Sequence, residues 1–153
     1  MIVVSDTSAI TALLQVGRAE LLQKLYGEVF IPEAVRGELA QSHSSLPTFV
    51  RCERVLNMDE VQRLLAEIDS GEAEAIVLAK ERRADVLLID DLEARRVAQR
   101  EGVPFIGLLG VLVQAKQAGH VASVRDLTAE LERVADFRLS AEIKEVAFRK
   151  AGE

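Results

Sequence analysis

The sequence predicts an α/β protein with a three-layer α/β/α arrangement, in which a central parallel sheet of four to five strands lies between two layers of helices. Two observations support this fold class. Short β-branched and apolar runs recur along the chain, and amphipathic helical patterns separate them. Strands that alternate with helices form parallel sheets covered on both faces. A length of 153 residues with 49% hydrophobic residues is also typical of one globular domain, expected to span residues 1–153.

The expected elements follow one another in a regular order. Four strands are predicted, at residues 2–4, 29–31, 86–89 and 104–106. Helices are predicted between and after them, at residues 10–15, 19–26, 32–39, 58–68, 69–82, 92–101, 109–118, 124–135 and 141–150. Pro32 is well placed at the first position of its helix. Asp69 and Glu72 have the spacing of a capping box. Residues 40–49 are polar and are expected to form a surface loop.

Bulk composition excludes several classes of protein. The formal net charge of −6 argues against a protein that coats nucleic acid, although it does not exclude an enzyme that binds nucleic acid at one site. Cys52 is the only cysteine, so no internal disulfide is possible and a cytoplasmic location is expected. The chain starts without a signal-peptide pattern, and its longest mostly apolar run, at residues 105–113, is too short to span a bilayer. No membrane association is expected.

Acidic residues follow two of the predicted strands. Ligands of open parallel sheets bind beyond the carboxyl ends of the strands. Asp6 comes shortly after the first strand, and Asp90 and Asp91 come directly after the third. Taken alone, Asp6 is more often a helix cap or a turn residue, and Asp91 could cap the helix that follows it. The shared position at strand ends is the reason to group these residues.

Two glutamates join the candidates, each with a structural alternative. Glu38 lies in "VRGELA", where a solvated helix face is the common role for a glutamate. Glu74 heads a stripe with Val77 and Leu78, where a carboxylate is costly unless it is paired or reaches solvent at the edge. Glu72 is interpreted as a first-turn residue that interacts favourably with the helix dipole.

Other catalytic and metal-binding patterns are missing from the sequence. It has no glycine-rich phosphate loop, no paired-cysteine spacing and no His-Glu-x-x-His motif. His43 and His120 lie in a polar loop and after a glycine, where exposure is the expected state. Carboxylates are therefore the main candidates for chemistry.

The order of the motifs resembles a PIN domain. The segments are "VSDTSAI", "PEAVRGELA", "SGEAEAIVLAKE", "VLLIDDLEARRVA" and "VPFIGLLGVLVQAKQAG". More narrowly, the chain is similar to a prokaryotic PIN branch long described as a domain of unknown function, whose members end much as "FRLSAEIKEVAFRKAGE" does. The resemblance covers nearly the whole chain. It implies a metal-dependent ribonuclease, and because many PIN domains are VapC-like toxins, it implies the toxin of a type II toxin–antitoxin pair.

The resemblance also implies roles for individual residues. Asp6, Glu38, Glu74 and either Asp90 or Asp91 match the acids that bind metal and support catalysis. Glu74 stands where the toxin branch usually has aspartate, which leaves open whether it binds metal directly or through water. Mg²⁺ or Mn²⁺ is the expected cofactor, since hard cations of this kind prefer oxygen ligands.

The resemblance extends to substrate and partners. Ser8 matches the hydroxyl or amide position that supports the site, and Arg95 matches a basic position that could hold a substrate phosphate. RNA, a small antitoxin protein and a second copy in a homodimer are the implied partners. The alternative is a catalytically inactive PIN fold that serves as a binding or partner-docking module. The acidic total charge, the scarcity of aromatic residues and the glutamate at position 74 favour that alternative.

Overall fold

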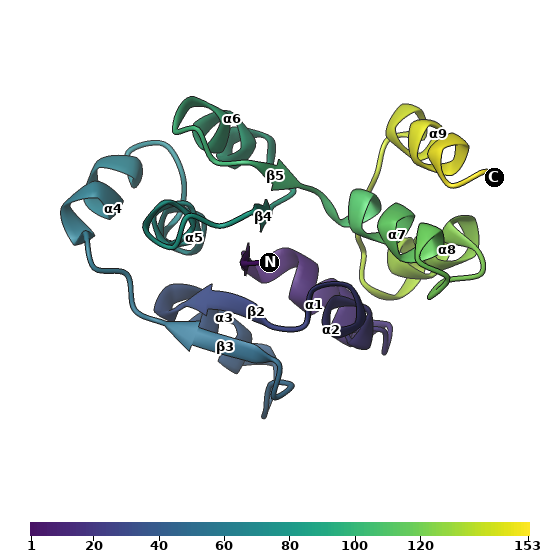
Figure 1. Ribbon diagram of the computed structural model, residues 1–153, viewed down its shortest axis with the longest axis horizontal. Coiled ribbons are helices and arrows are strands. Elements are labelled where there is room, and N and C mark those ends of the chain that lie inside the picture. Colours follow the sequence, from purple (N-terminus) through teal and green to yellow (C-terminus); the bar gives the residue numbers. More distant parts are fainter.

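A five-stranded parallel sheet forms the centre of the molecule (Figure 1). The computed structural model describes residues 1–153. Its strands are β1 (Val3–Ser5), β2 (Val29–Pro32), β3 (Val50–Glu53), β4 (Val86–Leu88) and β5 (Phe105–Ile106). They lie in the order β3-β2-β1-β4-β5, and every neighbouring pair is parallel. The predicted fold class is confirmed.

Nine helices surround this sheet, and each overlaps a helix expected from the sequence. They are α1 (Thr7–Gln15), α2 (Glu20–Tyr26), α3 (Glu33–Ser42), α4 (Met58–Leu64), α5 (Ser70–Glu81), α6 (Leu92–Arg100), α7 (Leu108–Gln117), α8 (Val124–Val134) and α9 (Ala141–Lys150). Local capping explains several of the starts. The Asp69 side chain accepts a hydrogen bond from the Glu72 amide at 3.0 Å, which confirms the predicted cap of α5.

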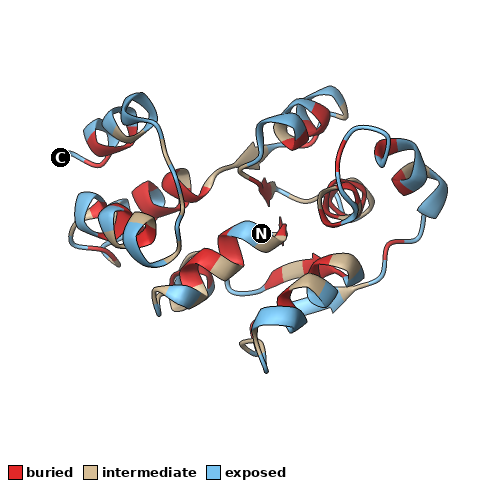
Figure 2. Ribbon diagram, turned by 180° about the vertical axis from the view of Figure 1, so that it is seen from behind, coloured by how far each residue is buried: buried red, intermediate tan, exposed pale blue.

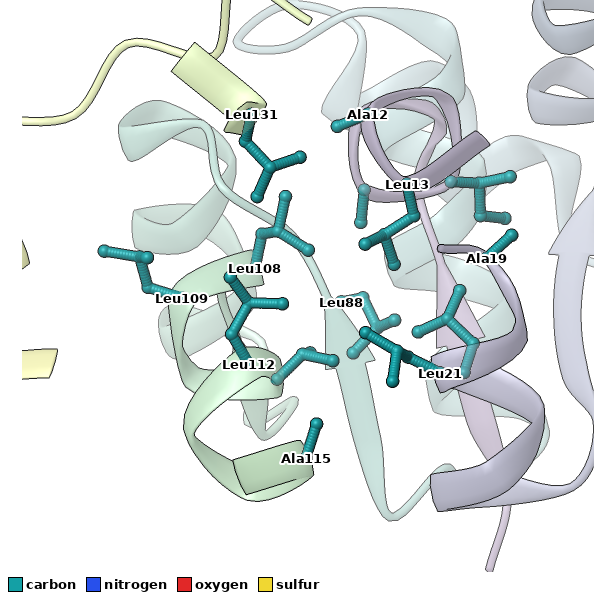
Figure 3. Packing of buried hydrophobic residues seen from close by; sticks show 14 of the residues in the cluster. Ala12, Leu13, Ala19, Leu21, Leu88, Leu108, Leu109, Leu112, Ala115 and Leu131 are labelled. Carbon is teal, nitrogen blue, oxygen red and sulfur yellow. The ribbon is translucent and has the colours of Figure 1, made fainter. Parts of the chain in front are cut away.

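The sheet separates two hydrophobic cores, because successive side chains of a strand point to opposite faces. In β4, Leu88 joins the larger core with α1, α2, α7 and α8, whereas Leu87 joins the smaller core with α4, α5 and α6. Figure 3 shows Leu88 between Leu13 and Leu21 on one side and Leu112 on the other. The sides of the helices that face the sheet are the buried ones (Figure 2).

The strand β3 is the element that the sequence prediction missed. It lies at the edge of the sheet and pairs only with β2, from Val29↔Val50 to Pro32↔Glu53. Its sequence "VRCE" contains two charged residues and is only partly buried, and it lacks the apolar run that predicts the other four strands. The predicted loop at residues 40–49 starts too early, because α3 continues to Ser42, and the remaining residues lead into β3.

No helix in the structure is long and apolar enough to cross a lipid bilayer.

The sheet order creates a switch point between β1 and β4. From β1 the chain first builds the sheet towards β2 and β3, and then returns to place β4 and β5 on the other side of β1. The loops after β1 and β4 consequently leave the sheet next to each other and in different directions. In open α/β sheets a crevice forms at such a point, and ligands bind there.

Candidate active site

Asp6 and Asp90 lie at the switch point, just beyond the carboxyl ends of β1 and β4. Ser5 pairs in register with Leu88, and the Asp6 amide donates a hydrogen bond to the Leu88 carbonyl at 3.1 Å. This pairing brings together two aspartates that are 84 positions apart in the sequence. Their charges interact, because the Asp90 carboxylate contributes to a raised pKa of Asp6.

Asp6 is a buried carboxylate with one oxygen that has no hydrogen-bond partner. Its residue is 3% exposed, and its Oδ1 atom has no hydrogen-bond partner. Asp6 stands in the N-cap position of α1, but its side chain makes no capping hydrogen bond. Burial and the Asp90 charge raise its pKa to about 8, while the amides of Ala9 and Ser8 oppose the rise. A buried acid in this state is a strong candidate for function.

Asp90 is fixed by two hydrogen-bond donors. Its Oδ1 accepts hydrogen bonds from the Leu108 amide at 3.1 Å and from Arg95 Nη2 at 3.3 Å. Arg95 is itself held by the Ile89 carbonyl, 3.0 Å from its Nε atom, and its guanidinium lies over the Phe105 ring. Burial nevertheless raises the pKa of Asp90 above its ordinary value.

Gly107 makes the arrangement of Arg95 and Asp90 possible. A Cβ atom at this position would lie 2.0 Å from Arg95 Nη2 and 2.7 Å from Asp90 Oδ1. Any side chain here would therefore displace at least one of the two groups. Glycine is required because of this close approach, not because of a special backbone angle.

Glu38 reaches the same region from α3. Its Oε2 atom accepts a hydrogen bond from the Thr7 hydroxyl, next to Asp6. A Cβ atom on Gly71 would lie 2.6 Å from Glu38 Oε1, so the carboxylate packs directly against the start of α5. Two elements far apart in sequence, α1 and α5, therefore position Glu38.

Glu72 is the site residue that sequence reasoning missed. Its charge raises the pKa of Asp6, and its own pKa is raised to about 7 by burial and by the charges of Asp69 and Asp91. The capping-box spacing with Asp69 is real: the Glu72 amide donates to the Asp69 side chain, and the Glu72 carboxyl group also interacts with that side chain. The available signal was its place immediately after Gly71, at the first turn of a buried helix. We refer to Asp6, Glu38, Glu72 and Asp90 as the acid group.

Glu74 is placed differently. It lies two positions after Glu72 in α5, and its Oε1 atom accepts a hydrogen bond from the Ala34 amide, 3.2 Å away, in the first turn of α3. Its carboxylate therefore has a structural partner there, whereas the glutamate whose charge reaches Asp6 is Glu72. Direct metal binding by Glu74 stays a prediction that this placement does not favour.

The other predicted residues divide between site and scaffold. The Asp91 side chain accepts a hydrogen bond from the Ala94 amide at 3.0 Å and so caps α6, which was the structural alternative for this residue. Ser8 is exposed in the first turn of α1, two residues from Asp6. Arg95 lies against Asp90 with 30% of its side chain exposed, so its first role is to hold that carboxylate.

The donor set fits a hard divalent cation in its chemistry. The acid group supplies carboxylate oxygens, which such cations prefer, and one buried oxygen of Asp6 is unpartnered. As the side chains stand, no three acidic, histidine or cysteine groups converge closely enough to hold a metal ion. Glu38 is turned to Thr7, and Asp90 is turned to Leu108 and Arg95. Asp6 and Asp90 are the residues best placed to hold a cation.

A protein-family model described as a PIN domain matches residues 2–153, which is almost the whole chain. No curated protein matches the sequence.

Proposed function

Because this chain belongs to the PIN-domain family, whose members are in general nucleases that use divalent metals, we propose that it is a Mg²⁺- or Mn²⁺-dependent endoribonuclease. The reaction is the hydrolysis of a phosphodiester bond in RNA. The observation that carries the proposal is the Asp6 carboxylate, which is buried, has one unpartnered oxygen and lies within reach of the charges of Asp90 and Glu72.

The proposed roles follow from the placement of each side chain. Asp6 and Asp90 hold the cation. Glu38, on α3, supplies a further carboxylate to the site. When bound, the divalent cation supplies positive charge that stabilises the negative charge developing on the phosphate. Arg95 fixes Asp90, and its side chain is 30% exposed, so we propose that it also contacts a substrate phosphate.

Glu72 is the proposed acceptor of the proton that the attacking water releases. A general base works best when its pKa lies near the working pH, and the pKa of Glu72 is raised to about 7. Burial at the start of α5 and the neighbouring acids Asp69 and Asp91 cause this rise. Its carboxylate can thus hold a proton transiently near neutral pH.

The direct test is RNA cleavage by the purified protein with Mg²⁺ or Mn²⁺. Metal-site electrostatics contribute several kcal/mol to such reactions, so Asp6→Asn should lower the rate by about 100-fold or more. Asp59→Asn is the matched control, because Asp59 is an exposed aspartate on α4. The proposal fails if neither metal supports cleavage, or if Asp6→Asn cleaves RNA as fast as the control.

The wider role that we propose is that of a toxin in a type II toxin–antitoxin pair, acting in the cytoplasm as a homodimer. The resemblance to VapC-like PIN domains supports this role. Induced expression in a bacterial host should arrest growth, and Asp6→Asn should relieve the arrest. A neighbouring gene for a small protein that restores growth would identify the antitoxin, and light scattering would give the oligomeric state.

A second candidate is a PIN fold that binds a partner without turnover. The specific observation in its favour is that the acid group does not converge on one point as the side chains stand. Calorimetric titration with Mn²⁺ separates the two candidates. Binding that Asp6→Asn abolishes would count against the inert module, whereas no binding at millimolar Mn²⁺ would favour it.

A further inference from the structure

The strand β3 has one side without a hydrogen-bonding partner. It is the last strand of the sheet and pairs only with β2 (Figure 1). The Val29 amide of β2 donates to the Phe49 carbonyl at 3.0 Å. Because backbone groups alternate in direction along a strand, those of Arg51 and Glu53 face β2 as well, and those of Cys52 point outwards. A free edge of this kind is a template for pairing with another strand.

The edge carries one positive and one negative side chain that remain accessible. Arg51 and Glu53 are two residues apart on β3, so their side chains lie on the same face of the sheet. Arg51 is 61% exposed, and its ion pair with Glu28, at 2.9 Å, is exposed too. Glu53 pairs with Arg82 at 2.8 Å and keeps 29% of its side chain exposed. Because exposed ion pairs contribute little to stability, both charges can also interact with a strand that arrives at the edge.

A second β3 strand brings unlike charges together in one register only. In an antiparallel pair, residues with outward backbone groups must lie opposite each other, so the pairing can be centred on Arg51, Cys52 or Glu53. A centre at Arg51 places two arginines opposite each other, and a centre at Glu53 places two glutamates, which is destabilising in both cases. A centre at Cys52 places Arg51 of each copy opposite Glu53 of the other. The sequence of the edge is therefore complementary to itself.

The same register satisfies the free backbone groups. The two Cys52 residues would form a hydrogen-bonded pair, in which each amide donates to the other carbonyl and the Cα atoms lie about 5.5 Å apart. Arg51 and Glu53 would form the pairs on either side of it, where directly opposite side chains approach more closely. Such an interface uses the same surface of both molecules, so it closes after two copies.

Apolar side chains next to the edge also lack cover. Leu56 is 82% exposed and Met58 45%, and both follow β3 directly in the chain. In the antiparallel arrangement, the segment after β3 of one copy runs towards the segment before β3 of the other, which contains the partly buried Leu46. Exposed apolar groups gathered at one place are typical of an interaction surface. Contacts can thus extend beyond the strand itself.

We propose that a second copy of this chain pairs along β3, antiparallel and centred on Cys52, so that one sheet runs through both molecules. Asp6 and Asp90 follow β1 and β4, which β2 separates from this edge, so the pairing does not cover them. The pairing rests on the homodimer of the proposed function, for which it names the surface. It does not rest on the nuclease activity, and it is tested without metal or RNA.

Two charge reversals test the pairing in analytical ultracentrifugation. Arg51→Glu gives an edge with two acids, and Glu53→Arg gives an edge with two bases. Each variant alone should dimerise about tenfold more weakly than the unchanged protein, or worse, because like charges then face each other. An equimolar mixture of the two variants should dimerise again, because unlike charges meet at both positions. Arg138→Glu is the matched control, since Arg138 is 88% exposed and lies between α8 and α9.

Cys52 tests the register, because it is exposed and is the only cysteine of the chain. A short bismaleimide, which joins two thiols, should link two copies of the unchanged protein. The double variant Cys52→Ser/Ala129→Cys should not be linked, because Ala129 is an exposed residue of α8. Cys52→Pro should abolish the dimer, since it removes an outward amide that the pairing with β2 does not use, whereas Cys52→Ala should keep it.

Three results would overturn the pairing. The unchanged protein could be a monomer at micromolar concentrations, in which case Arg51 and Glu53 only protect the edge. The mixture of the two variants could stay monomeric, or each variant alone could dimerise like the unchanged protein, which would place the interface elsewhere. The nuclease activity fails separately: a dimer that passes these tests but never cleaves RNA rejects the nuclease alone, and a monomer that cleaves RNA rejects the pairing alone.

Discussion

Two groups of carboxylates in this protein have opposite electrostatic settings. In the acid group, burial and neighbouring negative charge raise the pKa of Asp6 to about 8. At the junction of α4, α5 and α6, Glu101 is also largely covered, but hydrogen bonds from Lys80 and Arg63 lower its pKa to about 2. Coverage alone therefore does not decide the state of a carboxylate. What differs is whether the chain supplies cations to it.

The comparison separates a group that stabilises the fold from one that costs stability. Glu101 is ionised with three cationic partners, Lys80 at 2.8 Å, Arg63 at 3.2 Å and Arg100 at 3.5 Å. Asp6 has an oxygen without any partner, so ionising it requires a charge from elsewhere. Glu101 is paired with cations of the chain, whereas Asp6 is not. The unpaired acid, Asp6, therefore marks the better candidate for a ligand-binding site.

The largest expected effect is on the pH dependence of stability. Between the ordinary pKa of aspartate, 3.8, and about 8, folded Asp6 keeps a proton that the unfolded chain has released. Stability must then fall as pH rises, by at most about 1.4 kcal/mol per pH unit. We expect a loss of about 3 kcal/mol between pH 5 and pH 8, after allowing for relaxation of the site.

Urea unfolding in EDTA at several pH values measures this loss. Asp6→Asn should remove most of the slope, and Mg²⁺ or Mn²⁺ should restore stability to the unchanged protein at pH 8. Equal slopes for the two proteins would show that Asp6 is not the group responsible.

The next effect concerns Gly107. In Gly107→Ala the new methyl group must push Arg95 away, since it would lie 2.0 Å from Nη2, and it would also crowd Asp90. The arginine end can move at little cost to stability, but Asp90 then loses its alignment. RNA cleavage should fall by about tenfold, equivalent to about 1.4 kcal/mol in the barrier. Gly37→Ala is the matched control, because a Cβ atom there has nothing within 4 Å; equal losses in the two variants would contradict the prediction.

Glu72 and Glu74 give a paired test on one helix. Glu72→Gln should lower RNA cleavage by about tenfold or more, because an amide cannot accept the proton. Glu74→Gln should leave the rate nearly unchanged and lower stability by about 1 kcal/mol, since it weakens the bond to the Ala34 amide. Initial rates and urea midpoints measure both. The reverse pattern would restore Glu74 as the catalytic glutamate.

The smallest expected effect is that of replacing Glu101, the carboxylate that is paired with cations. Glu101→Gln should cost about 1 kcal/mol of stability at neutral pH and leave RNA cleavage unchanged. Because the folded pKa of Glu101 is lowered, its contribution is present above the ordinary value of 4.5 and is lost as pH falls towards 2. The stability difference between the two proteins should therefore disappear in acid. A difference that grew in acid would be inconsistent with the lowered pKa.

The sequence predicted the strands that contain an apolar run and missed the one strand that lacks such a run. Position at the edge of the sheet does not decide this, because the edge strand β5 is only partly buried and was still predicted. The inner strand β4 is apolar on both faces, so the run of four apolar residues at positions 86–89 is sufficient to predict it. β3 owes its place to hydrogen bonding with β2, and its own residues carry no apolar signal. The helices were found because each has either a periodic pattern or a recognisable cap.

Within the acid group, Asp6 and Asp90 were predictable from the sequence, whereas Glu72 was not. Asp6 and Asp90 follow strands, and the sheet fixes what lies beyond a strand end. The choice between Glu72 and Glu74 depends on the rotation of α5, which is buried on most of its surface and so has no clear polar face. Periodicity cannot orient such a helix. Its contacts with Glu38 and with the start of α3 do so, and these appear only in three dimensions.

The crowding at Gly71 and Gly107 has a consequence for the evolution of this fold. Both positions lie against acids of the site and have no room for a methyl group, so an inherited alanine there would have to be accompanied by a change in the acid or arginine beside it. These glycines are thus markers that can be read in a gene without any structure. A related protein that keeps the acids but has another residue at either glycine position must have a different arrangement of the site. Such a protein should be tested first for a changed or lost activity.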